Sequence, residues 1–432
     1  MGVLSKIIKQ PVVKIFSLNG ISVIIRILGG LVTSKAIAAY IGAGGLAVVG
    51  NFRNFLTPVE AYSTLGMQNG IIKYTAESQK ENQKLYAILS TVFFSITGVV
   101  IVLSTLLLCF AEHISHLVFE TVNDNYGWLF KVLAFSLPWY AGSLIFMALL
   151  NGLGAYKKVI WLNISGNILG VCLSVLLMWK FQTNGALLGL VLFQTLFFVI
   201  SFYNIWQQFP GLPFLNLKYF DFKILKGLLS FSFMSLITAI ISPLIYLSIR
   251  TNLISNYSPD TAGHWEAVNR LAGFYLMFAT TMLSIYFLPK LSLAQSRTET
   301  RKVFYDYYKS MLPLFGLGLI VLYLLREFVV LVIFEREFLP MTELFFWQLL
   351  GDFFKVGSLI LGYQFFAKKL TKAFLVTEIV SSIILYISCT LLIKDYGAKG
   401  AVMGYALTYF LYWIVLAVYF RKDLFGTGRE KF

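Results

Sequence analysis

Six basic side chains interrupt long apolar segments of the sequence: Arg26, Lys35, Arg53, Arg250, Arg270 and Lys355. Four acids lie in similar surroundings: Glu60, Glu266, Asp352 and Glu378. A charge at the centre of a bilayer costs roughly 2.5–3.5 kcal/mol on insertion scales, so such residues must face water or one another. Because the cations outnumber the acids, we expect a hydrated, positively charged site for an anionic head group.

The acids offer two kinds of chemistry. Asp352 and Lys355 are three residues apart and share a helix face, so they either neutralise each other or couple transport to an ion. Neither has a charged counterpart in the first half of the chain, which favours ion coupling. Glu378 is a second candidate for ion coupling, or a partner for Lys368 or Lys372 near the membrane surface.

The cations also have alternative roles. Lys35 and Arg250 are predicted near the ends of their helices, where long basic side chains can extend to the membrane surface. Arg53 and Arg270 are predicted about two turns deeper, and Arg26 lies nine residues from Lys35. This series of cations at different depths suits an anion that moves through the membrane.

The composition determines which elements must position these residues. Of 432 residues, 58% are hydrophobic and 13% are charged, against about 25% charged in a typical soluble domain. This balance excludes a soluble enzyme, a disordered protein and a nucleic-acid binder. Because about 20 apolar residues span a bilayer, the sequence predicts an all-α membrane protein of twelve spans: 14–40, 45–73, 85–111, 128–154, 158–180, 186–206, 224–254, 263–289, 308–334, 342–367, 372–393 and 399–420.

Basic residues in the connections predict the orientation. Most of the Lys and Arg residues outside the spans fall on the side that also holds both chain ends. Since cytoplasmic loops are rich in Lys and Arg, we expect both termini to be cytoplasmic. The formal net charge of +15 therefore reflects topology.

An internal repeat relates the two halves of the sequence at a constant offset. The sequence Gly-Ser-Leu-Ile occurs at 142–145 and again at 357–360, and the same offset aligns Lys35 with Arg250. We expect six-helix lobes at 1–206 and 224–432, joined by a cytoplasmic linker at 207–223. Six is an even number, so the lobes enter the membrane from the same side and a pseudo-twofold axis runs along the membrane normal.

Helix-breaking residues recur at matching places in the two halves. Pro243 interrupts the seventh span, and its counterpart in the first span lies beside Gly29 and Gly30. Paired bends of this kind favour hinges for alternating access, although a static kink gives the same pattern.

The sequence contains one pattern typical of a cofactor site and three histidines that could bind a metal, but neither lies in the structural context that such a site requires. Residues 42–47 match the dinucleotide pattern G-x-G-x-x-A, but no predicted strand precedes them. His113, His116 and His264 lack metal-ligand spacing. We therefore expect neither a cofactor nor a metal, and an ion gradient as the source of energy.

The segment from Trp347 to Lys368 resembles the Wzx-type lipid-linked oligosaccharide flippases. Its most specific parts are Trp347-Gln348-Leu349, Gly351-Asp352, Lys355-Val356-Gly357 and Gly362-Tyr363. The similarity is strongest to the lipid III flippases of enterobacterial common antigen and the O-antigen translocases. These belong to the multidrug/oligosaccharidyl-lipid/polysaccharide exporter superfamily.

The resemblance implies a function in lipopolysaccharide biosynthesis or polysaccharide export. It implies a flippase, not an enzyme, that moves an undecaprenyl-pyrophosphate-linked oligosaccharide from the cytoplasmic to the periplasmic leaflet of the bacterial inner membrane. The membrane cations would bind the pyrophosphate. Besides this substrate and membrane lipids, a polysaccharide polymerase and a chain-length regulator are the implied partners.

Three other functions fit the sequence less well. A lipid II flippase would take a substrate with the same anchor, and charge does not separate it from the first hypothesis. A multidrug exporter of the same superfamily would need an acidic cavity, whereas cations prevail here. A membrane-embedded glycosyl-transfer enzyme would need a large outer loop, which the sequence lacks.

Overall fold

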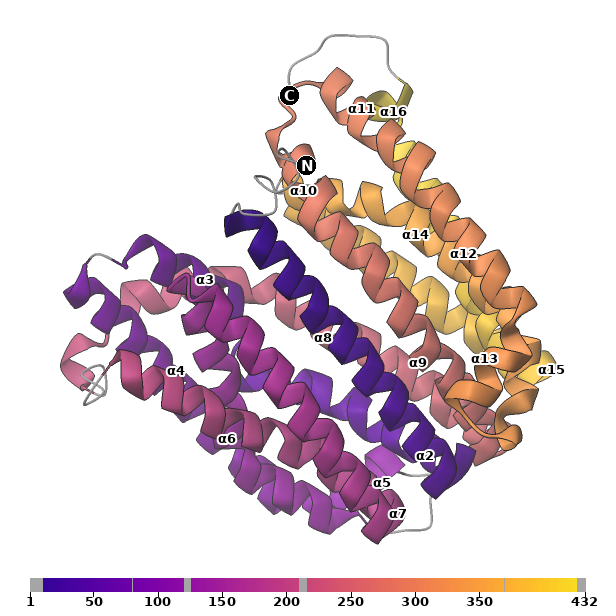
Figure 1. Cartoon of the computed structure of the whole chain (residues 1–432), viewed down its shortest axis with the longest axis horizontal. Coiled ribbons are helices and arrows are strands. Elements are labelled where there is room, and N and C mark those ends of the chain that lie inside the picture. The colour runs from indigo at the N-terminus through magenta and orange to yellow at the C-terminus, as the bar shows by residue number, and fades with distance from the viewer. Residues whose placement is uncertain (1–10, 80, 120–125, 210–215, 369, 426–432) are drawn as a thin grey trace, which may run out of the picture. The chain divides into compact units, whose positions relative to one another are not determined.

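The computed structural model describes residues 11–79, 81–119, 126–209, 216–368 and 370–425, nearly all of them helical (Figure 1). Contacts divide the chain into two compact units. Unit 1 comprises 1–41 and 51–243, and unit 2 comprises 42–50 and 244–432. The chain ends, which we predicted to be cytoplasmic, lie outside the described residues.

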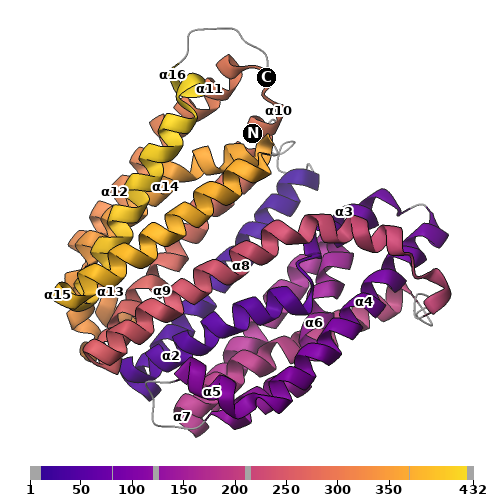
Figure 2. The same ribbon diagram turned by 180° about the vertical axis from the view of Figure 1, so that it is seen from behind.

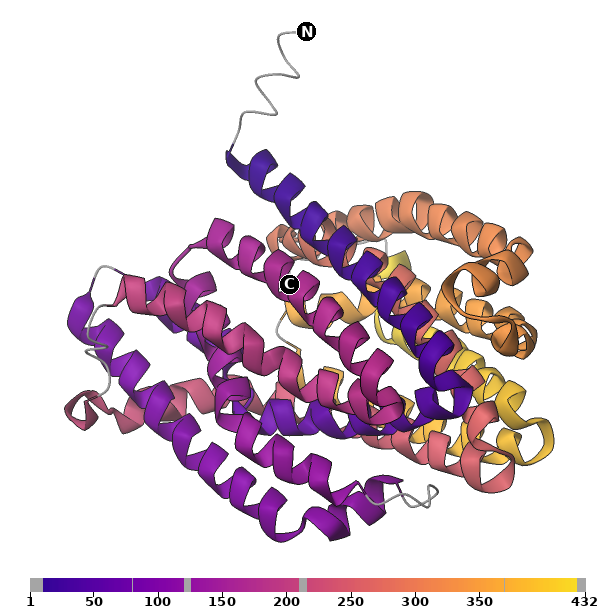
Figure 3. The ribbon, with the colours of Figure 1, turned by 60° about the horizontal axis from the view of Figure 1, so that its bottom comes forward.

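Unit 1 is built from long helices and short connecting segments. They are α2 (Pro11–Ser63), α3 (Gln68–Glu77), α4 (Asn82–Cys109), α5 (Ala111–Phe119), α6 (Gly127–Gly152), α7 (Tyr156–Gln208), η1 (Leu217–Tyr219) and the first part of α8 (Phe222–Asn256). Helices α4, α6 and α7 lie alongside one another (Figure 1). In α2 the chain reverses direction at Gly42, whose φ of 65° is non-helical (Figure 3).

Unit 2 begins with the second part of α8 and also contains the reversal in α2. Its other elements are α9 (Pro259–Met282), η2 (Leu283–Phe287), α10 (Leu288–Leu293), α11 (Arg297–Asp306), η3 (Tyr307–Met311), α12 (Leu312–Leu324), α13 (Arg326–Ile333), η4 (Arg336–Leu344), α14 (Phe345–Ala367), α15 (Thr371–Tyr419) and α16 (Arg421–Phe425). Helices α12, α14 and α15 lie side by side (Figure 2).

The helices account for the twelve predicted spans. Seven helical stretches of the described residues are long and apolar enough to cross a membrane. Three of them contain one non-helical residue each, at Gly42, Gln182 and Gly397, and so form two spans each. With α8 and α9 the total is twelve. Large apolar side chains such as Leu314, Leu324 and Val376 are exposed on these helices, as expected for lipid-facing positions.

The repeat found in the sequence is also present in the backbone. Gln182 and Gly397 are related by the offset that aligns Lys35 with Arg250. Their dihedral angles are similar, with φ, ψ of 50°, −126° and 58°, −136°. Helix α4, at 82–109, likewise corresponds to the helical stretch at 297–324. The chain therefore repeats helix by helix.

Glycines allow close packing of helices at several positions. A Cβ atom on Gly166 or Gly170 would overlap the ring of Phe197 or of Phe193. A Cβ atom on Gly400 would overlap the backbone carbonyl of Leu392, which lies on the preceding part of α15, before the bend at Gly397. Any larger residue at these positions would force the helices apart.

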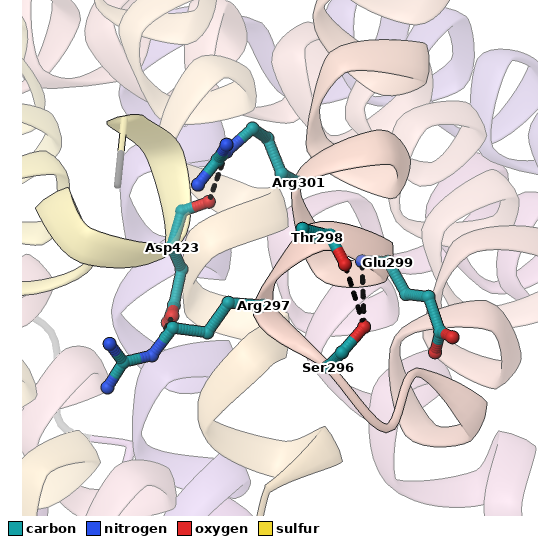
Figure 4. Close-up of polar contacts among 6 residues, drawn as sticks. All are labelled: Ser296, Arg297, Thr298, Glu299, Arg301 and Asp423. Atoms are coloured by element: carbon teal, nitrogen blue, oxygen red, sulfur yellow. Dashed lines mark hydrogen bonds and ion pairs between the residues drawn. The ribbon is translucent and has the colours of Figure 1, made fainter. Parts of the chain in front are cut away.

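Two predicted spans need correction. The span predicted at 45–73 is interrupted, because Leu65 and Gly66 have positive φ angles of 51° and 61° between α2 and α3. The span predicted at 308–334 is instead a helical stretch that begins at Arg297 and ends at Leu324. The reason is a helix start that resembles a capping box. The Ser296 hydroxyl accepts from the Glu299 N–H at 3.3 Å (Figure 4). The Glu299 carboxylate in turn accepts from the Gln295 N–H at 2.7 Å.

The predicted lobes at 1–206 and 224–432 stay a prediction. The contact-based units differ from them because residues 224–243 group with unit 1 and residues 42–50 group with unit 2. The chain just before residue 224 is bonded within unit 1: the Ser90 hydroxyl donates to the Asn216 carbonyl at 2.9 Å, and the Asp221 N–H donates to the Thr91 hydroxyl at 2.9 Å. Part of the predicted linker, 210–215, lies outside the described residues.

Candidate functional site

Arg250 and Glu266 form a buried ion pair in unit 2. Arg250 lies on α8 and is 1% exposed, and its guanidinium donates to the Glu266 carboxylate on α9. The guanidinium also lies over the ring of Trp265, 5.5 Å from its centroid. A Cβ atom on Gly50 would lie 2.8 Å from the guanidinium carbon, so a larger residue there would displace the guanidinium.

The chain reversal at 42–50 is held by one acidic residue of unit 2, Glu337. The Ala43 N–H donates to the Glu337 carboxylate at 3.1 Å. This carboxylate lies at the start of the helix that follows Gly42, where the helix dipole favours negative charge. His264 Nε2 lies 3.0 Å from the Glu337 carbonyl oxygen, which connects α9 to the same turn.

Asp352, on α14, is fully buried and surrounded by uncharged hydrogen-bond donors. The Tyr405 hydroxyl donates to it at 2.7 Å, the Gln348 amide donates at 3.2 Å, and the Tyr275 hydroxyl donates to the same oxygen as Gln348. Lys355 lies over the rings of Tyr409 and Tyr405, at 4.7 Å and 5.5 Å from their centroids. Although both lie in the described part of the chain, Asp352 and Lys355 do not form a direct ion pair.

Glu378 is half-buried on α15, on the helix that follows α14. Lys368, one of its two predicted partners, donates to the carbonyl of Ala294. The ammonium of Lys368 therefore has an acceptor other than Glu378.

Unit 1 holds one acid beside a small cavity. The Tyr140 hydroxyl on α6 donates to the Glu60 carboxylate on α2. Glu60 lines an open cavity of about 230 Å³ together with polar and small residues, namely Thr57, Ala61, Thr64, Gly66, Gln68 and Ala239. Glu60 therefore has room for water, in contrast to the enclosed carboxylate of Asp352.

The remaining predicted cations differ in exposure. Arg26 and Arg53 in unit 1 are exposed, Lys35 in unit 1 is half-buried, and Arg270 in unit 2 is half-buried. The side chains of Arg26 and Arg53 are therefore not enclosed by other protein groups.

The predicted hinge residues lie in different structural settings. Pro243 is the last residue of unit 1, and α8 continues through it. Gly29 and Gly30 are helical, and their carbonyls accept hydrogen bonds from Thr33 at 2.7 Å and Ser34 at 2.8 Å. Such side-chain bonds often bend helices. Gly29 also packs closely, since a Cβ atom there would lie 2.9 Å from Val171.

Sequence reasoning missed the uncharged groups that surround the acids. Tyr140, Tyr275, Tyr405 and Gln348 carry no charge that marks them in an apolar segment. The Arg250–Glu266 pair did leave a signal, because the two residues lie at similar distances before and after the break between α8 and α9.

Solved structures show which class of protein has this fold. A multidrug resistance MATE family transporter in an inward-facing conformation matches with a TM-score of 0.81 at 12% identity, over 92% of this chain and 94% of that one. The lipid II flippase MurJ matches with a TM-score of 0.71 at 16% identity, over 95% and 89%. The fold is therefore that of a multi-pass, twelve-helix membrane transporter.

Sequence comparison defines the family within this class. A model described as polysaccharide biosynthesis protein matches residues 44–343. The lipid III flippase of Escherichia coli (strain K12) is 30% identical over 393 residues, which cover 90% of this chain and 94% of that protein. The chain belongs to the polysaccharide biosynthesis protein family. It is a flippase of the membrane, not an enzyme, and the predicted resemblance is confirmed.

Proposed function

We propose that this protein flips an undecaprenyl-pyrophosphate-linked oligosaccharide from the cytoplasmic to the periplasmic leaflet of the bacterial inner membrane by alternating access. The observation that carries the proposal is the set of basic side chains within apolar helices, several of them accessible. The 30% identity to a lipid III flippase supports a lipid-linked glycan as the substrate class. A lipid III unit or an O-antigen repeat unit would both fit.

The accessible cations would bind the pyrophosphate. Arg26 and Arg53 are exposed, and Lys35 and Arg270 are half-buried, so part of each side chain can be reached by a phosphate. Arginine binds phosphate oxygens with two parallel hydrogen bonds, which suits a pyrophosphate. Arg250 would first have to separate from Glu266, and Lys355 from its two tyrosine rings.

Asp352 and Glu378 would couple flipping to an inward ion gradient. Lys355 is one turn from Asp352 and lies over Tyr405, which also donates to Asp352. When a phosphate draws Lys355 away, the ionised form of Asp352 loses the nearby positive charge, and the acid takes up a proton. This is reciprocal linkage between substrate and proton.

Substitution of the accessible arginines tests the proposal. Arg53→Ala and Arg270→Ala should abolish complementation of a flippase-null strain while membrane abundance stays normal. Lys84→Ala is the matched control, because Lys84 is an exposed cation that lies 4.0 Å from Glu81 at the start of α4. Full activity of both arginine variants would refute pyrophosphate binding at these positions.

Cross-linking tests alternating access. Cysteine pairs at the outer ends of the first and seventh spans, in a chain without Cys109, Cys172 and Cys389, should block transport until reduced. Continued transport with all molecules cross-linked would refute this part of the proposal.

A lipid II flippase and a multidrug exporter are the alternatives. MurJ and the MATE transporter share the fold at identities of 16% and 12%, which carries no information on the substrate. Mass spectrometry of the lipid that co-purifies with the protein separates the three. A peptide-bearing head group would indicate lipid II, and an organic cation would indicate a multidrug exporter.

A further inference from the structure

A surface groove at the basic end of unit 2 combines an aromatic lining with a single arginine. It holds about 420 Å³ of open volume. Its walls come from α11, η3, α15 and α16, and its lining residues are Arg301, Phe304, Tyr305, Tyr308, Trp413, Ala417, Leu424 and Phe425. Tyr and Trp concentrate at membrane–water interfaces, where one part of the ring is apolar and another is hydrated. The lining is therefore typical of a site at the membrane surface.

Arg301 is fixed in position but has one donor without an acceptor in the described part of the chain. Its Nε donates to the Asp423 carbonyl oxygen at 3.3 Å (Figure 4). Its Nη2 is buried and has no hydrogen-bond partner among the residues that the structure describes. A buried donor without an acceptor costs free energy, more so when it is charged. An anion at Nη2 would remove this cost.

The Asp423 carboxylate, beside Arg301, already has another partner. The Asp423 carboxylate lies 3.4 Å from Arg297 Nε, so it neutralises Arg297 (Figure 4). Arg301 donates to the backbone carbonyl of Asp423, and the single charge of the Asp423 carboxylate is shared with Arg301 and Lys368, so positive charge prevails around it. The neighbouring basic residues Lys309, Arg421 and Lys422 add to the positive charge of this end.

We propose that this groove binds an anionic phospholipid of the surrounding membrane, with its phosphate on Arg301 and an acyl chain along Phe304, Trp413 and Ala417. The charge favours a phosphate, and the apolar walls favour a chain that a free anion would not supply. Basic pockets between membrane helices bind lipid head groups by the same chemistry. This site is separate from the membrane cations of the proposed function.

Lipid titration with native mass spectrometry tests this assignment. The probe is dioleoylphosphatidylglycerol added to the full-length protein in detergent. Arg301→Gln should weaken binding about tenfold, since it removes a charge-assisted hydrogen bond. The matched control is Lys302→Gln, which removes the same charge from the next residue of α11 but lies outside the groove, and it should bind as the wild type does.

A second variant tests the apolar part of the groove. Ala417→Phe fills the groove without changing any charge, and it should weaken lipid binding as strongly as Arg301→Gln. Equal binding by the Arg301 and Lys302 variants would overturn the proposal. So would inorganic phosphate that displaces the lipid at equal concentration, which would indicate a simple anion site.

The substrate carrier is the remaining competitor. Undecaprenyl phosphate should not displace phosphatidylglycerol from the groove at equal concentration. Displacement would assign the groove to the substrate and overturn a phospholipid site. Neither result affects the proposed function, because that is tested separately through Arg53 and Arg270.

Discussion

Unit 1 and unit 2 place different groups at equivalent positions of the repeat. In unit 2, Arg250 is paired with Glu266 on the neighbouring helix. The offset of the repeat places Lys35 and Asn51 at the corresponding positions of unit 1. An amide cannot neutralise a cation as a carboxylate can. The comparison indicates that unit 2 uses this position for stability, whereas unit 1 has an amide in place of the carboxylate.

The acids differ between the units in a second way. Each unit has a tyrosine that donates to a carboxylate between equivalent helices. In unit 1 the acid is Glu60 on α2 and the tyrosine is Tyr140 on α6, whereas in unit 2 the tyrosine is Tyr275 on α9 and the acid is Asp352 on α14. Glu60 and Tyr275 occupy equivalent positions of the repeat. Both units thus have a tyrosine–carboxylate hydrogen bond between these two helices. The helix that carries the acid in unit 1 corresponds to the helix that carries the tyrosine in unit 2.

The largest expected effect follows from breaking the buried pair in unit 2. Glu266→Gln leaves Arg250 buried without a counter-charge, and breaking a buried pair in this way costs about 3–5 kcal/mol. We expect a large fall in membrane abundance and in the thermal unfolding temperature of the purified protein. Asn51→Gln is the matched change in unit 1, and because it alters no charge it should cost much less.

A double variant separates stability from substrate binding. Arg250→Met with Glu266→Leu replaces both charges by apolar groups, which is often neutral for stability. If this variant is stable and complements a flippase-null strain, Arg250 is structural. A stable but inactive double variant would instead support Arg250 as a pyrophosphate ligand and weaken our comparison of the units.

The sequence predicted the helices better than the partners of the charged groups. Twelve spans follow from apolar length, and the reversal at Gly42 follows from a glycine-rich connection, because both depend on local properties. The interruption at Leu65 and Gly66 was missed because it lies within an apolar run. Tyr275 and Tyr405 meet Asp352 only through tertiary packing, since they come from three different helices. Spacing within one segment does not reveal such a cluster.

Removal of each acid tests the second difference between the units. Asp352→Asn should reduce flipping in proteoliposomes at least about tenfold and flatten its dependence on pH. The amide cannot take up a proton when Lys355 moves away, nor release one when Lys355 returns. Glu60→Gln should retain most of the activity and its pH dependence, since Glu60 borders a cavity with room for water and is less enclosed than Asp352. The measurement is the initial flipping rate across a series of pH values. Wild-type behaviour of Asp352→Asn would leave Asp352 a structural role and make Glu378 the next carboxylate to test.

The smallest expected effect concerns the exchanged tyrosines. Tyr275→Phe and Tyr140→Phe each remove one hydroxyl that donates to a carboxylate, and a hydrogen bond to a charged group contributes about 1.5–3 kcal/mol. Glu60 can replace the lost donor with water from its cavity, so Tyr140→Phe should cost less than this range. Asp352 is fully buried, so it keeps only Tyr405 and Gln348 as donors after Tyr275→Phe, and no water can take the vacant place. Thermal unfolding of the two variants should therefore show the larger destabilisation in Tyr275→Phe. An equal loss in both would mean that water reaches Asp352 as readily as Glu60, which would remove the difference in enclosure between the two units.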